Sequence, residues 1–170
     1  MQTPAQRECD SFYGNPRGQG GATVSKKWYA ENIVLVPAPW KMAMGTIKIT
    51  RIPFHKKAAP ALQLVFGRIL DTMTPAEITD AGLDVFSGSF NYRVMRGGSA
   101  LSMHAYGIAI DHDAARNGLG DRTPHLAHFP KVLNAYKAEG AIWGGDWDGD
   151  GDTLDERRCD GMHFQFARLG

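Results

Sequence analysis

Two short segments of the chain carry residue types that bind a catalytic zinc ion. The first segment ends at Asp111 and contains His104, and the second segment ends at His163. A catalytic zinc usually takes three protein ligands, drawn from histidine and carboxylate side chains, and leaves a fourth position for water. His104, Asp111 and His163 meet that requirement. We therefore predict that these three residues bind zinc.

The spacing within the first segment sets a condition on its backbone. Side chains on a straight strand alternate between its two faces, so only residues an even number of positions apart share a face. His104 and Asp111 are an odd number of positions apart. The chain must therefore bend between them, and Gly107 is the residue at which a bend costs least.

The second segment is expected to form a strand that borders a cleft. Within residues 162–166, large apolar residues alternate with His163 and Gln165, which predicts one face in the core and one face in a cleft. Asp160 has the wrong parity for that straight strand, so Gly161 must turn it toward the metal. A carboxylate held beside a metal without binding it is suited to be the general base for hydrolysis. We predict that role for Asp160.

Three stretches of the sequence together resemble one family of zinc peptidases. They are Ser-x-His-x-x-Gly-x-Ala-x-Asp at 102–111, Trp-Gly-Gly-Asp-Trp at 143–147 and Asp-x-x-His at 160–163. The family is that of the D-Ala-D-Ala carboxypeptidase/VanY-type zinc peptidases. The likeness covers roughly residues 84–166 and, more loosely, 28–70, and it is closest to the phage endolysins that cut the L-Ala-D-Glu bond of peptidoglycan. The resemblance implies the same zinc ligands and the same general base that the residue types and their spacing predict.

The resemblance also implies an arginine upstream of the first motif, which polarises the scissile carbonyl and stabilises the oxyanion. The segment Phe-Asn-Tyr-Arg at 90–93 is the best match, so Arg93 is the expected residue, and Arg96 is the alternative. A cation directed at the developing negative charge carries a large share of the rate enhancement in such reactions.

Further residues are expected around the substrate. We expect Ser102 to orient the loop or a zinc ligand by hydrogen bonding, because a nucleophilic serine would need its own base and no Gly-x-Ser-x-Gly elbow is present. Trp143 and Trp147 are expected on the cleft wall, with the core as the alternative. Gln165 departs from the family, where an acidic residue is common, and this bears on substrate preference.

The activity implied by the resemblance is zinc-dependent cleavage of the L-Ala-D-Glu bond in the peptidoglycan stem peptide. A D-Ala-D-Ala carboxypeptidase is the closest alternative. A zinc-stabilised module that binds the cell wall without cutting it is a further alternative. Asp160 argues against such a module, because a structural zinc needs no base and is usually coordinated by protein alone.

The segment 146–157 is an acidic loop that departs from the family pattern. Its carboxylates alternate along the chain with a glycine at the sixth position, as in the first half of an EF-hand calcium loop; they are Asp146, Asp148, Asp150 and Asp152. The twelfth position is Arg157 instead of glutamate, which weakens the match. Two interpretations stay open, a loop that binds calcium and a solvated acidic turn.

Composition limits the class of protein. A chain of 170 residues with a net charge of +1 is most simply one domain, 1–170, with room for a sizeable core. Its basic pairs, such as Arg157 and Arg158, are isolated and expected to be solvated, which argues against a nucleic-acid partner. No signal peptide or membrane-spanning stretch is recognised. We expect a monomeric cytoplasmic protein without a membrane partner that acts on the wall after release from a phage-lysed host.

The elements that must position the site form an α+β pattern. Strands are expected at 32–36 and 46–50 and near Tyr92, Ile108 and Phe164. Helices are expected at about 58–70, from Thr74 onward and at 130–139, and an irregular arm is expected over 1–26. We predict helices packed on a small, mainly antiparallel sheet, with the zinc site in a cleft, as in the hedgehog/D-Ala-D-Ala peptidase-like fold.

Overall fold

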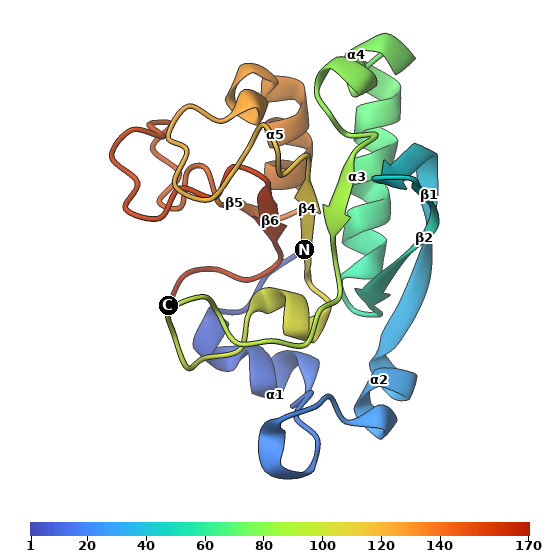
Figure 1. Cartoon of the computed structure of the whole chain (residues 1–170), viewed down its shortest axis with the longest axis vertical. Helices are drawn as coiled ribbons and strands as arrows, with labels where there is room; N and C mark the ends of the chain where they lie inside the picture. Colours follow the sequence, from blue (N-terminus) through green and yellow to red (C-terminus); the bar gives the residue numbers. More distant parts are fainter.

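The computed structural model describes residues 1–170 and has the predicted α+β architecture (Figure 1). Its helices are α1 (Cys9–Tyr13), α2 (Lys26–Asn32), α3 (Ala59–Thr72), α4 (Pro75–Asp80) and α5 (Pro130–Ala138). Its strands are β1 (Ile33–Met44), β2 (Ile47–His55), β3 (Phe86–Gly88), β4 (Ala109–His112), β5 (Ile142–Trp143) and β6 (His163–Gln165). Short 3-10 helices are η1 (Gln6–Glu8), η2 (Gln19–Gly21), η3 (Met103–Tyr106) and η4 (His125–His128). No helix is both long enough and apolar enough to span a bilayer.

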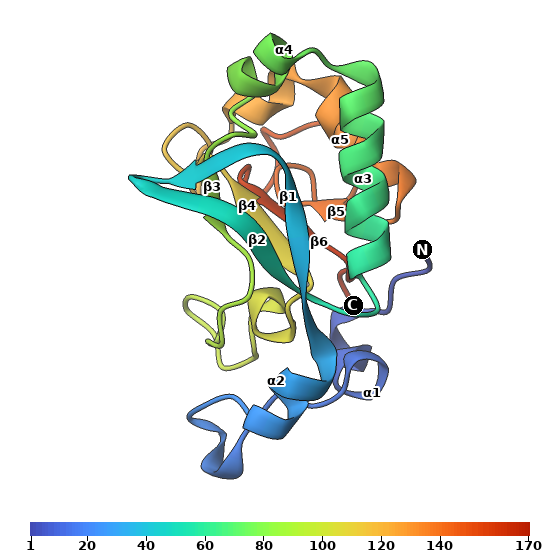
Figure 2. The ribbon, with the colours of Figure 1, turned by 90° about the vertical axis from the view of Figure 1, so that its right-hand side faces the viewer.

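The strands form two antiparallel sheets. One sheet has the strand order β3-β4-β6-β5, and the other is the β1-β2 ribbon, whose turn extends away from the first sheet (Figure 2). In the larger sheet, Asp111 of β4 pairs with His163 of β6. Two of the three predicted zinc ligands are therefore cross-strand neighbours, whose side chains lie close together.

The predicted strand near Tyr92 is wrong. The first strand of the larger sheet is β3, which ends at Gly88, and Tyr92 lies outside any strand. The chain after β3 is held by single contacts, such as the hydrogen bond from Asn91 N to His104 O (3.0 Å) and an isolated bridge between Val94 and Leu101. Apolar and polar residues alternate here without a neighbouring strand to pair with.

Helices α3 and α5 pack against each other and against the strands (Figure 1). The apolar positions that predicted α3 are all buried, and they are Leu62, Val65, Phe66 and Ile69. In α5, the ring of Tyr136 stacks on that of Phe164 in β6, with centroids 3.8 Å apart. Because neighbouring residues of a strand point to opposite faces, this packing directs His163 away from the core and into the site.

The ends of two helices follow the predicted signals. Thr74 caps α4, because its hydroxyl accepts from Glu77 N while the Glu77 carboxylate accepts from Thr74 N. Gly140 follows α5 with φ of 87°, the left-handed conformation that commonly terminates a helix.

The expectation of an irregular arm over residues 1–26 is wrong in part. This segment contains η1, α1 and η2, and α2 begins at Lys26. Cys9 and Tyr13 are buried, and the Tyr13 hydroxyl donates to Phe166 O at 2.8 Å. The segment is therefore docked on the end of β6. Its short helix has only two buried positions, too few for a periodic pattern to stand out.

Candidate active site

The backbone bends between His104 and Asp111, as predicted. His104 lies in η3, Asp111 lies in β4, and Gly107 ends η3 with φ of 67°. A Cβ atom on Gly107 would lie 2.6 Å from Ile33 Cδ1 and 3.2 Å from His55 N. Both the backbone angle and the lack of space therefore favour glycine at this turn.

The three predicted zinc ligands meet at one point. His104 Nε2 lies 3.2 Å from both His163 Nδ1 and Asp111 Oδ2, and His163 Nδ1 lies 3.0 Å from Asp111 Oδ1. Ligands at bond lengths of about 2.0 to 2.1 Å from a tetrahedral zinc are about 3.3 Å apart. The donor set and its spacing therefore fit zinc, and this group could hold a metal ion.

Hydrogen bonds from the outer edge of each histidine ring fix the tautomer that a metal requires. His104 Nδ1 donates to Ser89 O at 2.6 Å, and His163 Nε2 donates to Gln165 Oε1 at 3.0 Å. The nitrogen that faces the other ligands is then free of a proton in each neutral ring, which is the usual arrangement around metal-binding histidines.

Charge also favours metal binding at this point. Burial acts to raise the pKa of Asp111, but hydrogen bonds from the rings of His104 and His163, whose inner protons a bound metal ion would replace, outweigh it and hold that pKa far below its ordinary value. The pKa of His163 is raised, because the hydrogen bond and charge of Asp111 exceed the opposing effect of burial. Asp111 thus stays ionised and concentrates negative charge where a cation would be bound.

Asp160 presents a free carboxylate oxygen beside the three ligands. The four residues line one cavity of about 370 Å³, and Asp160 Oδ1 is buried without a hydrogen-bond partner. The turn predicted at Gly161 is present, because His163 N donates to Asp160 O at 3.0 Å. A Cβ atom on Gly161 would lie 2.2 Å from Pro124 Cβ, so close packing requires glycine there.

Burial raises the pKa of Asp160, and the positive charges of His163 and Arg96 oppose this only in part. A carboxylate with a raised pKa binds a proton more readily, as a general base must. The environment of Asp160 therefore suits the predicted role.

Both candidate arginines line the cavity. Arg93 Nη1 donates to Val94 O at 3.3 Å. Arg96 is the one whose charge acts on the pKa of Asp160. Both arginines thus lie at the site, and the charge of Arg96, the alternative, acts to lower the pKa of the base.

The other predicted site residues separate into two groups. Ser102 lines the cavity, and its hydroxyl caps η3 by accepting from His104 N at 3.3 Å, which fits an orienting role. Trp147 also lines the cavity, with its ring centroid 5.8 Å from that of His163. Trp143 is not on the cleft wall, because its ring packs beside Phe164 and its indole N–H donates to Gly161 O.

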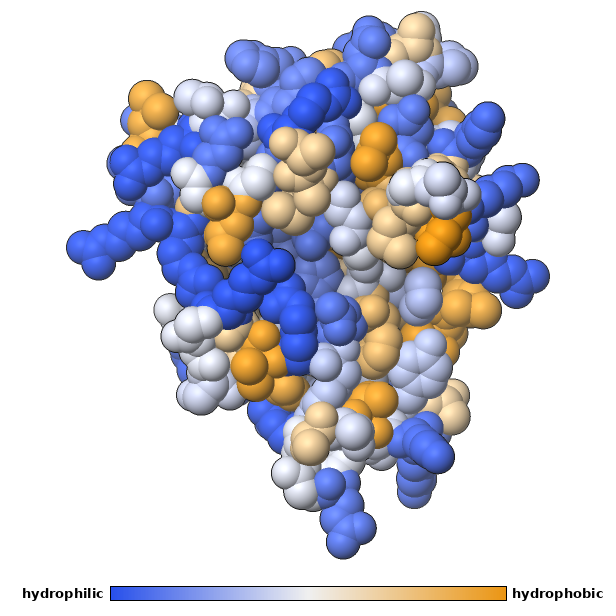
Figure 3. All heavy atoms as spheres, viewed as in Figure 1, coloured by the Kyte–Doolittle hydropathy of each residue, from blue (hydrophilic) through white to orange (hydrophobic).

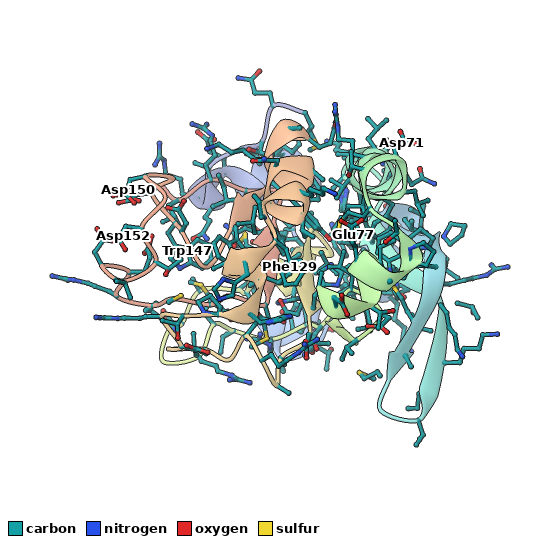
Figure 4. All side chains as sticks on the ribbon, turned by 90° about the horizontal axis from the view of Figure 1, so that it is seen from above. Asp71, Glu77, Phe129, Trp147, Asp150 and Asp152 are labelled. Atoms are coloured by element: carbon teal, nitrogen blue, oxygen red, sulfur yellow. The ribbon has the colours of Figure 1, made fainter.

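The acidic loop places three carboxylates together at the molecular surface. Oxygen atoms of Asp146, Asp148 and Asp150 lie within 4.8 Å of one another, and Asp152 is not part of that group. Figure 4 shows Asp150 and Asp152 at the outer margin of the molecule, with Trp147 farther in. Exposed acidic groups are common without an ion, so both interpretations of the loop, a calcium site and a solvated acidic turn, stay predictions.

Two arginines of the cavity were not expected there from the sequence. Arg157 and Arg158 are exposed, as expected, but both also line the cavity that holds Asp160. Their position a few residues before the predicted base was the signal that could have indicated this.

Comparison with known proteins agrees with the geometry. Residues 96–166 match the family model described as D-alanyl-D-alanine carboxypeptidase. No curated protein and no solved structure matches the chain. The matched residues include the three candidate ligands and the candidate base. The match supports a zinc metallopeptidase that acts on the peptide part of peptidoglycan.

Proposed function

We propose that this protein is a zinc-dependent peptidoglycan hydrolase of the phage endolysin type, which cuts the L-Ala-D-Glu bond of the stem peptide. The observation that carries the proposal is the unpartnered, buried Oδ1 atom of Asp160 in the cavity of the three candidate ligands. A buried polar atom without a partner is costly. Its presence here favours a reaction over a purely structural metal site.

The reaction follows from what each residue can do. A bound zinc ion would polarise the scissile carbonyl and make a water molecule more acidic. Asp160 Oδ1 takes the proton from the attacking water and then gives it to the nitrogen of the leaving amine. Arg93, with Arg96 as the alternative, places its guanidinium beside the carbonyl oxygen and stabilises the negative charge that develops there.

The walls of the cavity complete the proposed site. Trp147 lies beside His163 and, with Ser102, contacts the substrate. In this proposal the protein acts as a monomer and meets the wall when a phage lyses its host. The choice of the L-Ala-D-Glu bond rests on the likeness of the sequence motifs to those of the endolysin branch.

A D-Ala-D-Ala carboxypeptidase is the second candidate, favoured by the description of the matching family. Mass spectrometry of purified peptidoglycan and of soluble stem peptides, after incubation with the zinc-loaded protein, separates the candidates. New D-Glu amino termini are the expected result. Loss of a terminal D-Ala would instead assign a carboxypeptidase, and no cleavage of either substrate would contradict the proposal and favour a wall-binding module.

A further inference from the structure

Four arginines line the cavity of the candidate active site. Arg93 and Arg96 lie between β3 and η3, whereas Arg157 and Arg158 lie at the end of the acidic loop. The two segments meet, because Arg158 Nη2 donates to Arg96 O at 2.9 Å. Figure 3 shows strongly hydrophilic side chains gathered where the acidic loop faces the segment that follows β3.

None of these four guanidinium groups forms an ion pair with a carboxylate. The arginines that do form ion pairs are Arg17, Arg68 and Arg116, which lie elsewhere. The loop that carries Arg157 and Arg158 is rich in carboxylates, but several of these accept hydrogen bonds from backbone amides of the loop itself. The cavity arginines thus remain available to a ligand.

The three carboxylates that line the cavity form no ion pair with these arginines. Asp111 is held between His104 and His163. Asp160 has a free oxygen, and Glu156 accepts from the backbone amides of Trp147 and Asp148. Four arginines therefore face three engaged or catalytic carboxylates, and a bound divalent cation would add further positive charge. Such a cavity favours an anionic ligand.

We propose that Arg157, supported by Arg158, forms a subsite that binds a carboxylate of the substrate beside the bond that is cut. This inference rests on the proposed peptidase function. Arginine suits the role because its planar guanidinium can bind a carboxylate through two parallel hydrogen bonds. The substrate class is therefore an acidic peptide with a free carboxylate close to the scissile amide.

Two synthetic peptides test the subsite. They have the same sequence, and they differ only in a carboxylate or a carboxamide on the residue that follows the scissile bond. Calorimetry measures the binding of both peptides to the zinc-loaded Asp160→Asn protein, in which cleavage does not interfere. Steady-state kinetics measures KM and kcat for both peptides with the zinc-loaded protein that retains Asp160. The unmodified site is expected to prefer the carboxylate peptide about tenfold, because a hydrogen bond to a charged group contributes that much or more.

Arg157→Gln is the main variant, because its side chain is exposed at the cavity and its loss need not disturb the fold. It is expected to weaken binding and raise KM for the carboxylate peptide about tenfold, with less than about twofold change for the carboxamide peptide and in kcat. Arg122→Gln is the matched control, since Arg122 is exposed beside the same loop but does not line the cavity. It is expected to leave both peptides unaffected.

Equal binding of the two peptides would overturn the subsite, as would an equal loss for both in Arg157→Gln. An equal effect of Arg122→Gln would also overturn it, because it would show only the general charge of the loop. A carboxylate preference that disappears in Arg157→Gln without any cleavage would support the subsite and contradict the proposed function. Cleavage of both peptides without a preference would contradict the subsite and support the proposed function.

Discussion

Gln165 is expected to control metal affinity through His163. Its Oε1 atom accepts from His163 Nε2 at 3.0 Å, and its amide nitrogen donates to Ala167 O at 2.7 Å, which fixes which end of the amide faces the ring. Gln165→Leu keeps much of the volume and removes the acceptor. The ring can then carry its proton on Nδ1, the atom that faces Asp111 and the metal position.

The expected loss is about 10-fold to 100-fold in zinc affinity, the range that follows removal of such outer hydrogen bonds. This corresponds to about 1.4 to 2.7 kcal/mol, which agrees with about 1 to 3 kcal/mol for a buried donor left without a partner. Competition with a chromophoric chelator measures the zinc affinity. Thermal unfolding of the metal-free variant checks that its fold is intact.

Gln165→Glu is the comparison variant, because it keeps an oxygen that can accept from His163 Nε2 and loses only the donor to Ala167 O. It is expected to bind zinc within about threefold of the unmodified protein, since the hydrogen bond that sets the tautomer is retained. If Gln165→Leu binds zinc as tightly as the unmodified protein, the argument that Gln165 fixes the tautomer is refuted.

Three further predictions concern stability and pH. Gly107→Ala should lower the free energy of unfolding in urea by at least about 1 to 2 kcal/mol, because of its left-handed backbone. The loss should exceed that in Gly45→Ala, because Gly45 has a similar φ and no atom within 4 Å of an added Cβ. Equal losses in the two variants would contradict the clash with Ile33. Burial raises the pKa of Asp160. As pH decreases, kcat/KM should therefore decline at a higher pH than it would with an ordinary aspartate as the base. A decline at or below the ordinary aspartate pKa would contradict this. Burial lowers the pKa of His55 to about 4, so the contribution of neutral His55 to stability is complete above about pH 6.5 and is lost as pH falls toward 4, by about 2 kcal/mol at pH 5. Denaturant unfolding at pH 7 and pH 5 should therefore show a larger loss of unfolding free energy in the unmodified protein than in His55→Asn. An equal change in the two proteins would contradict this.

The sequence predicted the centre of the site well because its constraints are local. The parity of His104 and Asp111 required a bend, and only a glycine tolerates the angle and the space found at Gly107. The alternation around His163 likewise indicated which face of its strand would be buried. The larger helices were predictable for the same reason, because α3 buries one continuous apolar face.

Features that depend on tertiary contacts were not predictable in this way. Trp143 and Trp147 have the same residue type and parity, and only the packing of β5 against β6 places the first beside Phe164 and the second in the cavity. Arg157 belongs to a loop whose sequence suggested calcium. It lines the cavity where its neighbour Arg158 contacts the segment after β3, and no local pattern encodes that tertiary contact.

The role of Asp160 in hydrolysis is tested by comparing the rate of peptidoglycan cleavage by the unmodified protein and by Asp160→Ala, each loaded with zinc and assayed for bound metal. We expect equal zinc content in both proteins and a cleavage rate that is lower by about 10² to 10⁴ in the variant, the usual contribution of a general base. Equal zinc content with an unchanged rate of cleavage would contradict the assignment of Asp160 and the proposed mechanism.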